Sequence, residues 1–219
     1  MRILIIGAGK VGSSVAGNLV SESNDITIVD TNKAKIAEIQ SNYDLQGIVG
    51  DATSPSVLAD AGAVDADMII AVTANDETNL AVTLIAEQLF NVPSRIARVR
   101  NDELREYPAL LSTSGFRATS VIWPEEAITN YIVQLITYPE ALQVIEFSDG
   151  DVVLMSVKIV SSSKMCGRPV SALQDELPRV KVQIVSIYRQ KYRLDDIDGK
   201  TVLEAGDEIF FLTTKACAH

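Results

Sequence analysis

A glycine-rich turn near the N-terminus constrains the fold more than any other feature of the sequence. Residues 7–12 read GAGKVG, which is a GxGxxG pattern placed directly after the apolar run 2–6 and before a segment with helical spacing of apolar residues. In such a strand–turn–helix unit the first glycine permits the tight turn, the second lets the backbone approach a pyrophosphate, and the third lets the helix lie close to the strand. Backbone N–H groups at the helix start would then face the anion. The turn predicts a dinucleotide-binding α/β domain.

The first 120 residues alternate between short apolar runs and longer amphipathic segments. Such alternation is typical of βαβ units and a parallel sheet covered by helices on both faces. The expected strands are residues 2–6, 25–30, 45–49, 66–72, 95–100 and 119–122. The expected helices are residues 11–20, 32–43, 54–61, 76–90 and 104–111. The pattern predicts a Rossmann-like, doubly wound parallel sheet over residues 1–123.

A further helix begins at the segment WPEE, residues 123–126, and Tyr138-Pro139 ends it. Its apolar stripe, from Ala127 to Ile136, is wider than packing on one sheet requires, so we expect it to pack against something beyond its own sheet. After this helix the sequence pattern changes. We expect strands at 144–147, 152–160, 181–188 and 208–213, with a short helix near 169–177. We therefore predict three parts: the α/β domain 1–123, a crossover helix 124–139, and a smaller α+β domain 140–219.

Composition excludes several classes of function. The chain has 19 Lys and Arg against 29 Asp and Glu, a net charge of −10, so a nucleic-acid backbone would be repelled. No apolar run approaches the about 20 residues needed to cross a bilayer, and the apolar run after Met1-Arg2 is too short for a secretory signal. We expect a soluble cytoplasmic protein without a nucleic-acid partner.

The usual catalytic and metal-binding side chains are scarce. The single histidine is His219, the last residue, so Ser-His-Asp and Cys-His arrangements and histidine metal sites lack an internal imidazole. Cys166 and Cys217 lie 51 residues apart without CxxC spacing, which gives no zinc or disulfide framework. Tyr188 and Lys191 have the wrong spacing for a dehydrogenase Tyr-xxx-Lys pair. We predict no catalytic and no metal-binding residues, and we treat binding a cofactor and using it as separate properties.

Asp30 ends the second predicted strand, 18 residues after Gly12. A carboxylate there can accept both hydroxyls of an adenosine ribose and would repel a 2′-phosphate, which favours NAD over NADP. The simpler interpretation is that Asp30 caps the following helix. Because this half of the fold holds the AMP portion shared by NAD, ADP and ATP, the sequence does not choose among them.

Other polar residues follow the remaining strands, where the carboxyl ends of parallel strands form a ligand crevice. Asp51 is either an adenine-side contact or a turn residue capping the next helix, and Thr73-Ala74 would lie near the phosphates or the second ribose. Arg98 and Arg100, two apart on one strand, would share a face that meets an anionic ligand or an acid at a subunit interface, or that lies exposed at an edge. Lys10 reaches a terminal phosphate or faces solvent.

Five separated segments, in order and at matching spacings, resemble the RCK family of regulators of potassium conductance. They are MRILIIGAGKVGSSVAGNLVSESNDITIVD at the start, GDAT at 50–53, ADMIIAVTANDETNL at 66–80, RIARVRN at 95–101 and WPEE at 123–126. The resemblance covers nearly the whole chain. It implies a non-catalytic cytoplasmic subunit, peripheral on the inner face of the membrane, that binds NAD(H) or ATP/ADP and gates a membrane-embedded Trk-type potassium transporter.

The resemblance also implies that such modules form homo-oligomers through the crossover helix. It places Glu125 at the position of an acid that some relatives hold near a nucleotide-linked cation. Together with the glycine argument above, the predicted nucleotide contacts are Gly7, Ala8, Gly9, Lys10, Val11, Gly12, Asp30, Asp51, Thr73, Ala74 and Arg98.

Two other functions remain open from the sequence. The first is a small NAD-dependent oxidoreductase with its substrate site between the two domains. The second is a structural module that keeps the fold and binds no nucleotide.

Overall fold

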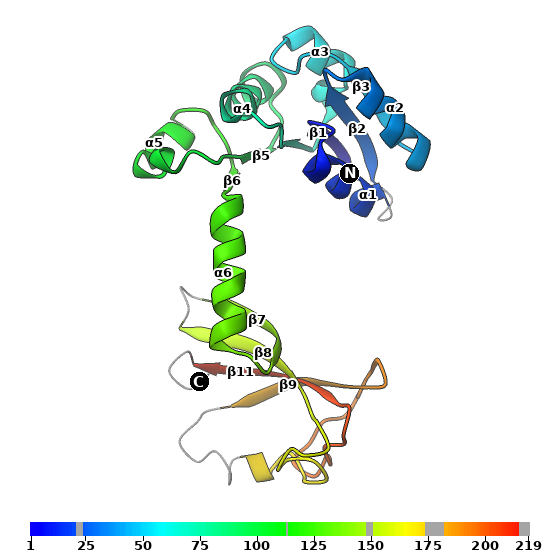
Figure 1. Cartoon of the computed structure of the whole chain (residues 1–219), viewed down its shortest axis with the longest axis vertical. Helices are drawn as coiled ribbons and strands as arrows, with labels where there is room; N and C mark the ends of the chain where they lie inside the picture. The colour runs from blue at the N-terminus through cyan, green and yellow to red at the C-terminus, as the bar shows by residue number, and fades with distance from the viewer. Residues whose placement is uncertain (21–23, 113, 148–150, 174–181, 215–219) are drawn as a thin grey trace. The chain divides into compact units, whose positions relative to one another are not determined.

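The computed structural model describes the chain except residues 21–23, 113, 148–150, 174–181 and 215–219, so Cys217 and His219 lie outside the described part (Figure 1). The chain divides into two compact units, Met1–Ala127 and Ile128–His219. The division falls inside one helix, α6 (Pro124–Thr137). The predicted boundaries after residues 123 and 139 stay predictions.

The first unit contains a six-stranded parallel sheet in the order β3-β2-β1-β4-β5-β6. Its strands are β1 Arg2–Ile6, β2 Asp25–Asp30, β3 Gln46–Val49, β4 Met68–Ala71, β5 Ser94–Arg98 and β6 Ser120–Ile122. Its helices are α1 Lys10–Val20, α2 Lys33–Asn42, α3 Pro55–Asp60, α4 Asp76–Phe90 and α5 Pro108–Leu111, with 3₁₀ turns η1 Ala63–Asp65 and η2 Asp102–Glu106. The predicted doubly wound sheet is confirmed.

Both faces of this sheet are buried, which explains why its strands are apolar throughout. Successive residues of β1 point to opposite faces, so Ile3 and Ile5 belong to one core and Leu4 and Ile6 to the other. The first core is covered by α1 and α2, and the second by α3 and α4. The two cores hold the strand ends rigidly, including the glycine turn between β1 and α1.

The helix expected over 104–111 is wrong as a single element. The structure has the short turn η2, then Tyr107, then α5. Pro108 lacks an N–H and disfavours helical dihedral angles at the preceding residue, so the chain restarts with Pro108 as the first residue of a new helix. The strand expected over 95–100 ends at Arg98, and Arg100 therefore lies beyond it.

The second unit contains a five-stranded antiparallel sheet in the order β10-β9-β11-β8-β7. Its strands are β7 Ala141–Phe147, β8 Val152–Lys158, β9 Gln183–Arg189, β10 Tyr192–Arg193 and β11 Glu208–Thr214. One core lies around Ile187, Leu203 and Ile209. The short strand β10 was not predicted. Residue 181 of the expected strand 181–188, and residues 174–177 of the short helix expected near 169–177, lie outside the described residues.

Candidate functional site

A cleft of about 670 Å³ lies at the carboxyl ends of the strands of the first unit, which we call the strand-end cleft. Its volume is in the range of small-molecule sites. Nine of the predicted contacts line it: Gly7, Gly9, Lys10, Val11, Asp30, Asp51, Thr73, Ala74 and Arg98. Ala8 and Gly12 are buried beside it and do not line it. The sheet therefore brings together residues that are far apart in sequence, while their contacts with a nucleotide stay predictions.

The three glycines of the turn have three different surroundings. Gly7 has a φ of +105° and approaches Thr73, which allows the chain to leave β1 sharply. A Cβ on Gly12 would lie 1.8 Å from the Gly7 carbonyl oxygen, so only glycine lets α1 start this close to β1. A Cβ on Gly9 would meet no protein atom within 4 Å. Gly9 thus leaves open space beside the cleft, as an approaching phosphate group requires.

The Asp30 carboxylate lies at the tip of β2 and braces the glycine turn. The Ala8 N–H donates to its Oδ2 at 2.7 Å, and the Asn32 N–H donates to its Oδ1 at 2.8 Å. The cap of α2 is Asn32, whose side chain accepts from the N–H groups of Ala34 and Lys35. Asp30 is therefore not the helix cap, and its carboxylate keeps further lone pairs for hydroxyl donors in the cleft.

Arg98 is the most unusual side chain of the strand-end cleft. The residue is 7% exposed, and its Nη2 donates to the Thr73 carbonyl oxygen at 2.6 Å. Its buried Nε has no hydrogen-bond partner among the described residues. Burial, together with the positive charge of Arg100, lowers the pKa of Arg98 from its ordinary value. Arg98 lines the cleft, and a guanidinium there with an unused donor fits an anionic ligand.

The other predicted residues divide between the two interpretations given for them. Arg100 and Lys10 are exposed at the cleft, so the expected arginine pair has one buried and one exposed member. Asp51 accepts from both the N–H and the Oγ1 of Thr53, and these bonds lower its pKa. The cap position of α3 is Ser54. Asp51 therefore closes a local turn at the cleft wall rather than capping that helix.

Sequence reasoning missed two contributors to the site. Lys35, on α2, lines the strand-end cleft near Asp30 and adds a positive charge. Asn79 is completely buried under the cleft and bonds to both Thr73 and Arg98. The signal for Asn79 was present: an amide at a core-facing position of the helix over 76–90 must find partners, because burying an unpaired amide is costly.

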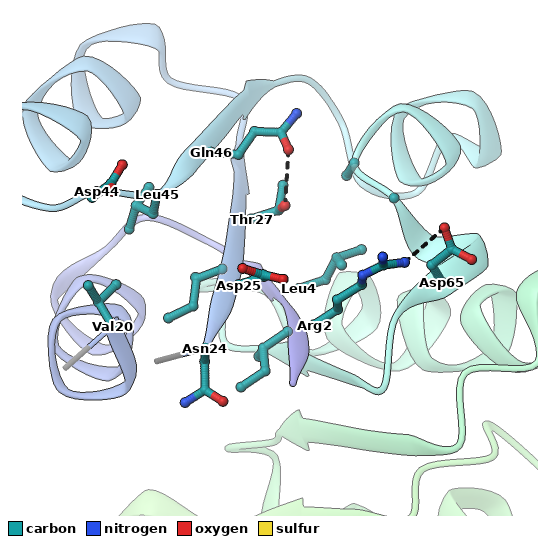
Figure 2. Close-up of a pocket in the computed structure, with 14 residues that line it drawn as sticks. Arg2, Leu4, Val20, Asn24, Asp25, Thr27, Asp44, Leu45, Gln46 and Asp65 are labelled. Carbon is teal, nitrogen blue, oxygen red and sulfur yellow. Dashed lines mark hydrogen bonds and ion pairs between the residues drawn. The ribbon is translucent and has the colours of Figure 1, made fainter. Parts of the chain in front are cut away.

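A second hollow, of about 820 Å³, lies at the opposite, amino ends of the same strands (Figure 2). Arg2 forms an ion pair with Asp65 at 3.1 Å there, and both side chains are largely exposed. The hollow has no GxGxxG turn, and none of its described lining atoms is a buried polar group without a partner. It lacks the features that point to a ligand at the strand-end cleft.

Metal-binding clusters and membrane-spanning helices are both absent from the described residues. No cluster of three or more side chains there could hold a metal ion. In the same residues, no helix has both the length and the apolar character that a membrane span needs.

The fold and the site define a class: a Rossmann-like domain with a GxGxxG turn at a strand-end cleft, followed by a small antiparallel domain. The family model of the TrkA-N domain matches residues 3–124, and that of the TrkA-C domain matches residues 154–217. The chain belongs to the TrkA family. This confirms the resemblance that the five sequence segments carried.

Individual relatives agree with this membership. The chain is 45% identical over 213 residues to "Trk system potassium uptake protein TrkA" of Vibrio alginolyticus, a match that covers 97% of this chain and 46% of that protein. The chain thus spans about half the length of the curated relatives it matches first. Such relatives are named for potassium uptake and not for an enzymatic activity, in agreement with the prediction of a non-catalytic protein.

Two solved structures share the fold. "Crystal Structure of the GsuK RCK domain" matches with a TM-score of 0.64 at 18% identity, covering 99% of this chain and 46% of that one. "GsuK channel bound to NAD" matches with the same TM-score and identity, covering 99% of this chain and 38% of that one. At this identity the likeness concerns the fold alone.

Proposed function

We propose that this chain is a regulatory module of a potassium uptake system that binds NAD(H), ADP or ATP in the strand-end cleft. The observation that carries the proposal is the buried Nε of Arg98, which has no partner among the described residues, on a residue that lines the cleft bordered by the glycine turn. A buried charged donor is stabilised when an anion meets it. The fold that the chain shares with "GsuK channel bound to NAD" supports the choice of ligand.

The chemistry of the cleft assigns a place to each part of a nucleotide. The diphosphate would lie over Gly9, where a side chain would fill the space, and near the cations of Lys10, Arg98 and Arg100. The ribose hydroxyls would donate to the lone pairs that remain on Asp30. Asp30 and Asp51 place carboxylates at the adenosine end, where Lys35 also lies, whereas Lys10, Arg98 and Arg100 supply the cations at the diphosphate end.

The signal would leave the cleft through the segment that follows β5. Arg100 and Asn101 donate their N–H groups to Asp76 Oδ2, both at 2.8 Å. Arg105, a few residues on, lies over the Trp123 ring at 4.5 Å and pairs with Glu126 at 3.1 Å, at the start of α6. A ligand that prefers one arrangement of these contacts would shift the population of that arrangement.

The module gates a membrane-embedded Trk-type potassium transporter in this proposal, and it acts from the cytoplasmic face as a homo-oligomer joined through α6. The exposed apolar stripe of α6 supports this assembly, because none of its residues is buried in the described chain.

The test combines binding with turnover. Isothermal titration of the full chain with NADH, ADP and ATP is expected to show saturable binding, and Asp30→Ala should weaken it by about tenfold or more. NADH incubated with the chain and small carbonyl substrates should not be oxidised. Steady NADH oxidation would instead support the oxidoreductase, and no binding of any of the three nucleotides would support a purely structural module.

A further inference from the structure

Asn79 lies beneath the strand-end cleft and outside its lining, yet it touches both strand ends that form the cleft floor. Its side chain has no solvent exposure. Its Oδ1 accepts from the Thr73 N–H at 2.9 Å and from the Thr73 Oγ1 at 2.7 Å. Its Nδ2 donates to the Thr73 carbonyl at 3.3 Å and to the Arg98 carbonyl at 2.8 Å. All four hydrogen-bonding positions of the amide are therefore used.

These four bonds link the end of β5 to the segment that follows β4, beyond the last paired residues of these two strands. Thr73 follows β4, and Arg98 is the last residue of β5. The two strands pair no further than Ala71 and Ala97, so Asn79 continues the connection past the end of the ladder. A fully satisfied buried amide is rigid, because every alternative arrangement leaves a polar atom unpaired.

The Thr73 carbonyl is the point at which this network meets the guanidinium. It accepts from both Asn79 Nδ2 and Arg98 Nη2. Among the described residues, the Thr73 carbonyl oxygen is the acceptor for the Arg98 guanidinium. Because the guanidinium is planar and rigid, the position of this carbonyl also fixes the direction of the unpartnered Nε. Arg98 is thus held at both ends, its backbone carbonyl and its guanidinium, by the same Asn79–Thr73 unit.

We infer that Asn79 is a positioning residue of the strand-end cleft, which orients Arg98 toward the phosphates of a nucleotide without touching the ligand itself. This inference rests on the proposed function. It requires that the effect of Asn79 on nucleotide affinity act through Arg98. A merely structural role would lower stability and leave affinity, measured on the folded chain, unchanged.

The chain provides a matched control on the same helix. Thr83 lies one turn after Asn79, is also fully buried, and has its Oγ1 at 2.8 Å from the carbonyl oxygens of Leu80 and Phe116. It does not line the strand-end cleft. Thr83→Val therefore removes a buried polar contact of α4 without changing the cleft.

The experiment measures ADP affinity by isothermal titration on the full chain, with melting curves to identify folded variants. Asn79→Leu, which removes all four bonds, is expected to bind ADP about tenfold more weakly, and Thr83→Val within about twofold of the unmodified chain. Asn79→Asp keeps the shape of the side chain and its acceptor oxygen but loses the two N–H donors. This variant replaces Asn79→Leu in the measurement if the leucine variant does not fold. It should weaken ADP binding in the same direction.

A double-mutant cycle with Arg98→Met separates the positioning role from a general one. If Asn79 acts through Arg98, the Asn79 substitution should cause no additional loss of ADP affinity in the Arg98→Met background. Additive losses, or an Asn79 variant that binds ADP like the unmodified chain, would overturn this inference and leave the proposed function intact. Failure of the unmodified chain to bind ADP, NADH or ATP would overturn both.

Discussion

At the scale of single residues, the glycine turn shows that one motif can hold residues for unrelated reasons. Gly12 is required by the protein's own backbone, since a side chain there would collide with the Gly7 carbonyl. Gly9 is not required by any protein contact, because the space beside it is open. The motif spacing identifies both positions, but only the surroundings of each Cα distinguish folding from binding.

This difference predicts that the same glycine-to-alanine substitution affects stability at Gly12 and ADP binding at Gly9. Gly12→Ala should lower the free energy of unfolding by about 3 kcal/mol, because the clash is with backbone that cannot rotate away. Gly9→Ala should leave the unfolding free energy within about 0.5 kcal/mol of its original value and weaken ADP binding by about tenfold or more. Urea unfolding and isothermal titration of both variants test this. Normal ADP binding by Gly9→Ala would contradict the placement of the diphosphate.

At the scale of elements, the second unit contains a partly buried ion pair between strand ends. Arg189, the last residue of β9, donates from Nε and Nη2 to the two carboxylate oxygens of Asp207, both at 2.8 Å. Asp207 directly precedes β11 and is fully buried. Burial raises the pKa of the Asp207 carboxyl, but hydrogen bonds from Arg189 and the Glu204 N–H outweigh it, so the pKa lies below its ordinary value.

The lowered pKa fixes the sign of a pH dependence. A carboxyl whose folded-state pKa is depressed stabilises the fold above its unfolded-state pKa of about 3.9, and this contribution is lost as the pH falls through the folded value. Asp207→Asn should therefore lower the stability of the second unit by about 2 kcal/mol at pH 7. The gap between variant and unmodified chain should narrow below about pH 4. Calorimetry of the full chain at several pH values measures this difference in stability. A difference that does not change with pH would contradict a lowered pKa of Asp207.

At the scale of the whole molecule, two compact units share one chain and α6 crosses the division between them. Ile128, Ile132, Leu135 and Ile136 form one stripe along this helix at i, i+4, i+7 and i+8 spacing, and each is at least 49% exposed. Exposed apolar stripes of this kind mark association sites. The assembly of the module is therefore a property to test on α6.

We expect the full chain to sediment as a homo-oligomer. Ile132→Glu, which places a charge in the centre of the stripe, should shift it toward monomer. Asn130 is exposed on the opposite side of the same helix, so Asn130→Asp adds a charge without changing the stripe and should keep the oligomer. Sedimentation velocity distinguishes these outcomes. A monomeric unmodified chain at tens of micromolar would contradict an assembly through α6.

The sequence by itself determined the alternation of strands and helices, the parallel sheet, the glycine turn and the acid at the tip of β2. These follow from local signals: apolar periodicity, the dihedral freedom of glycine, and residues that end a strand. It failed at Pro108, where one prolyl residue split an expected helix, and at Arg100, which lies beyond the end of β5. In both cases the local apolar pattern continued past the real end of an element.

Only the tertiary structure decided how the cleft is supported. Thr73, Asn79 and Arg98 are spread over 26 residues, and they meet because β4 and β5 pair in parallel while α4 packs against both. That pairing decides which of the two arginines, Arg98 or Arg100, is buried. It also decides that the Nε of Arg98 lacks a partner among the described residues. Hydrogen-bond satisfaction is a property of the surroundings in space, and a sequence pattern does not contain it.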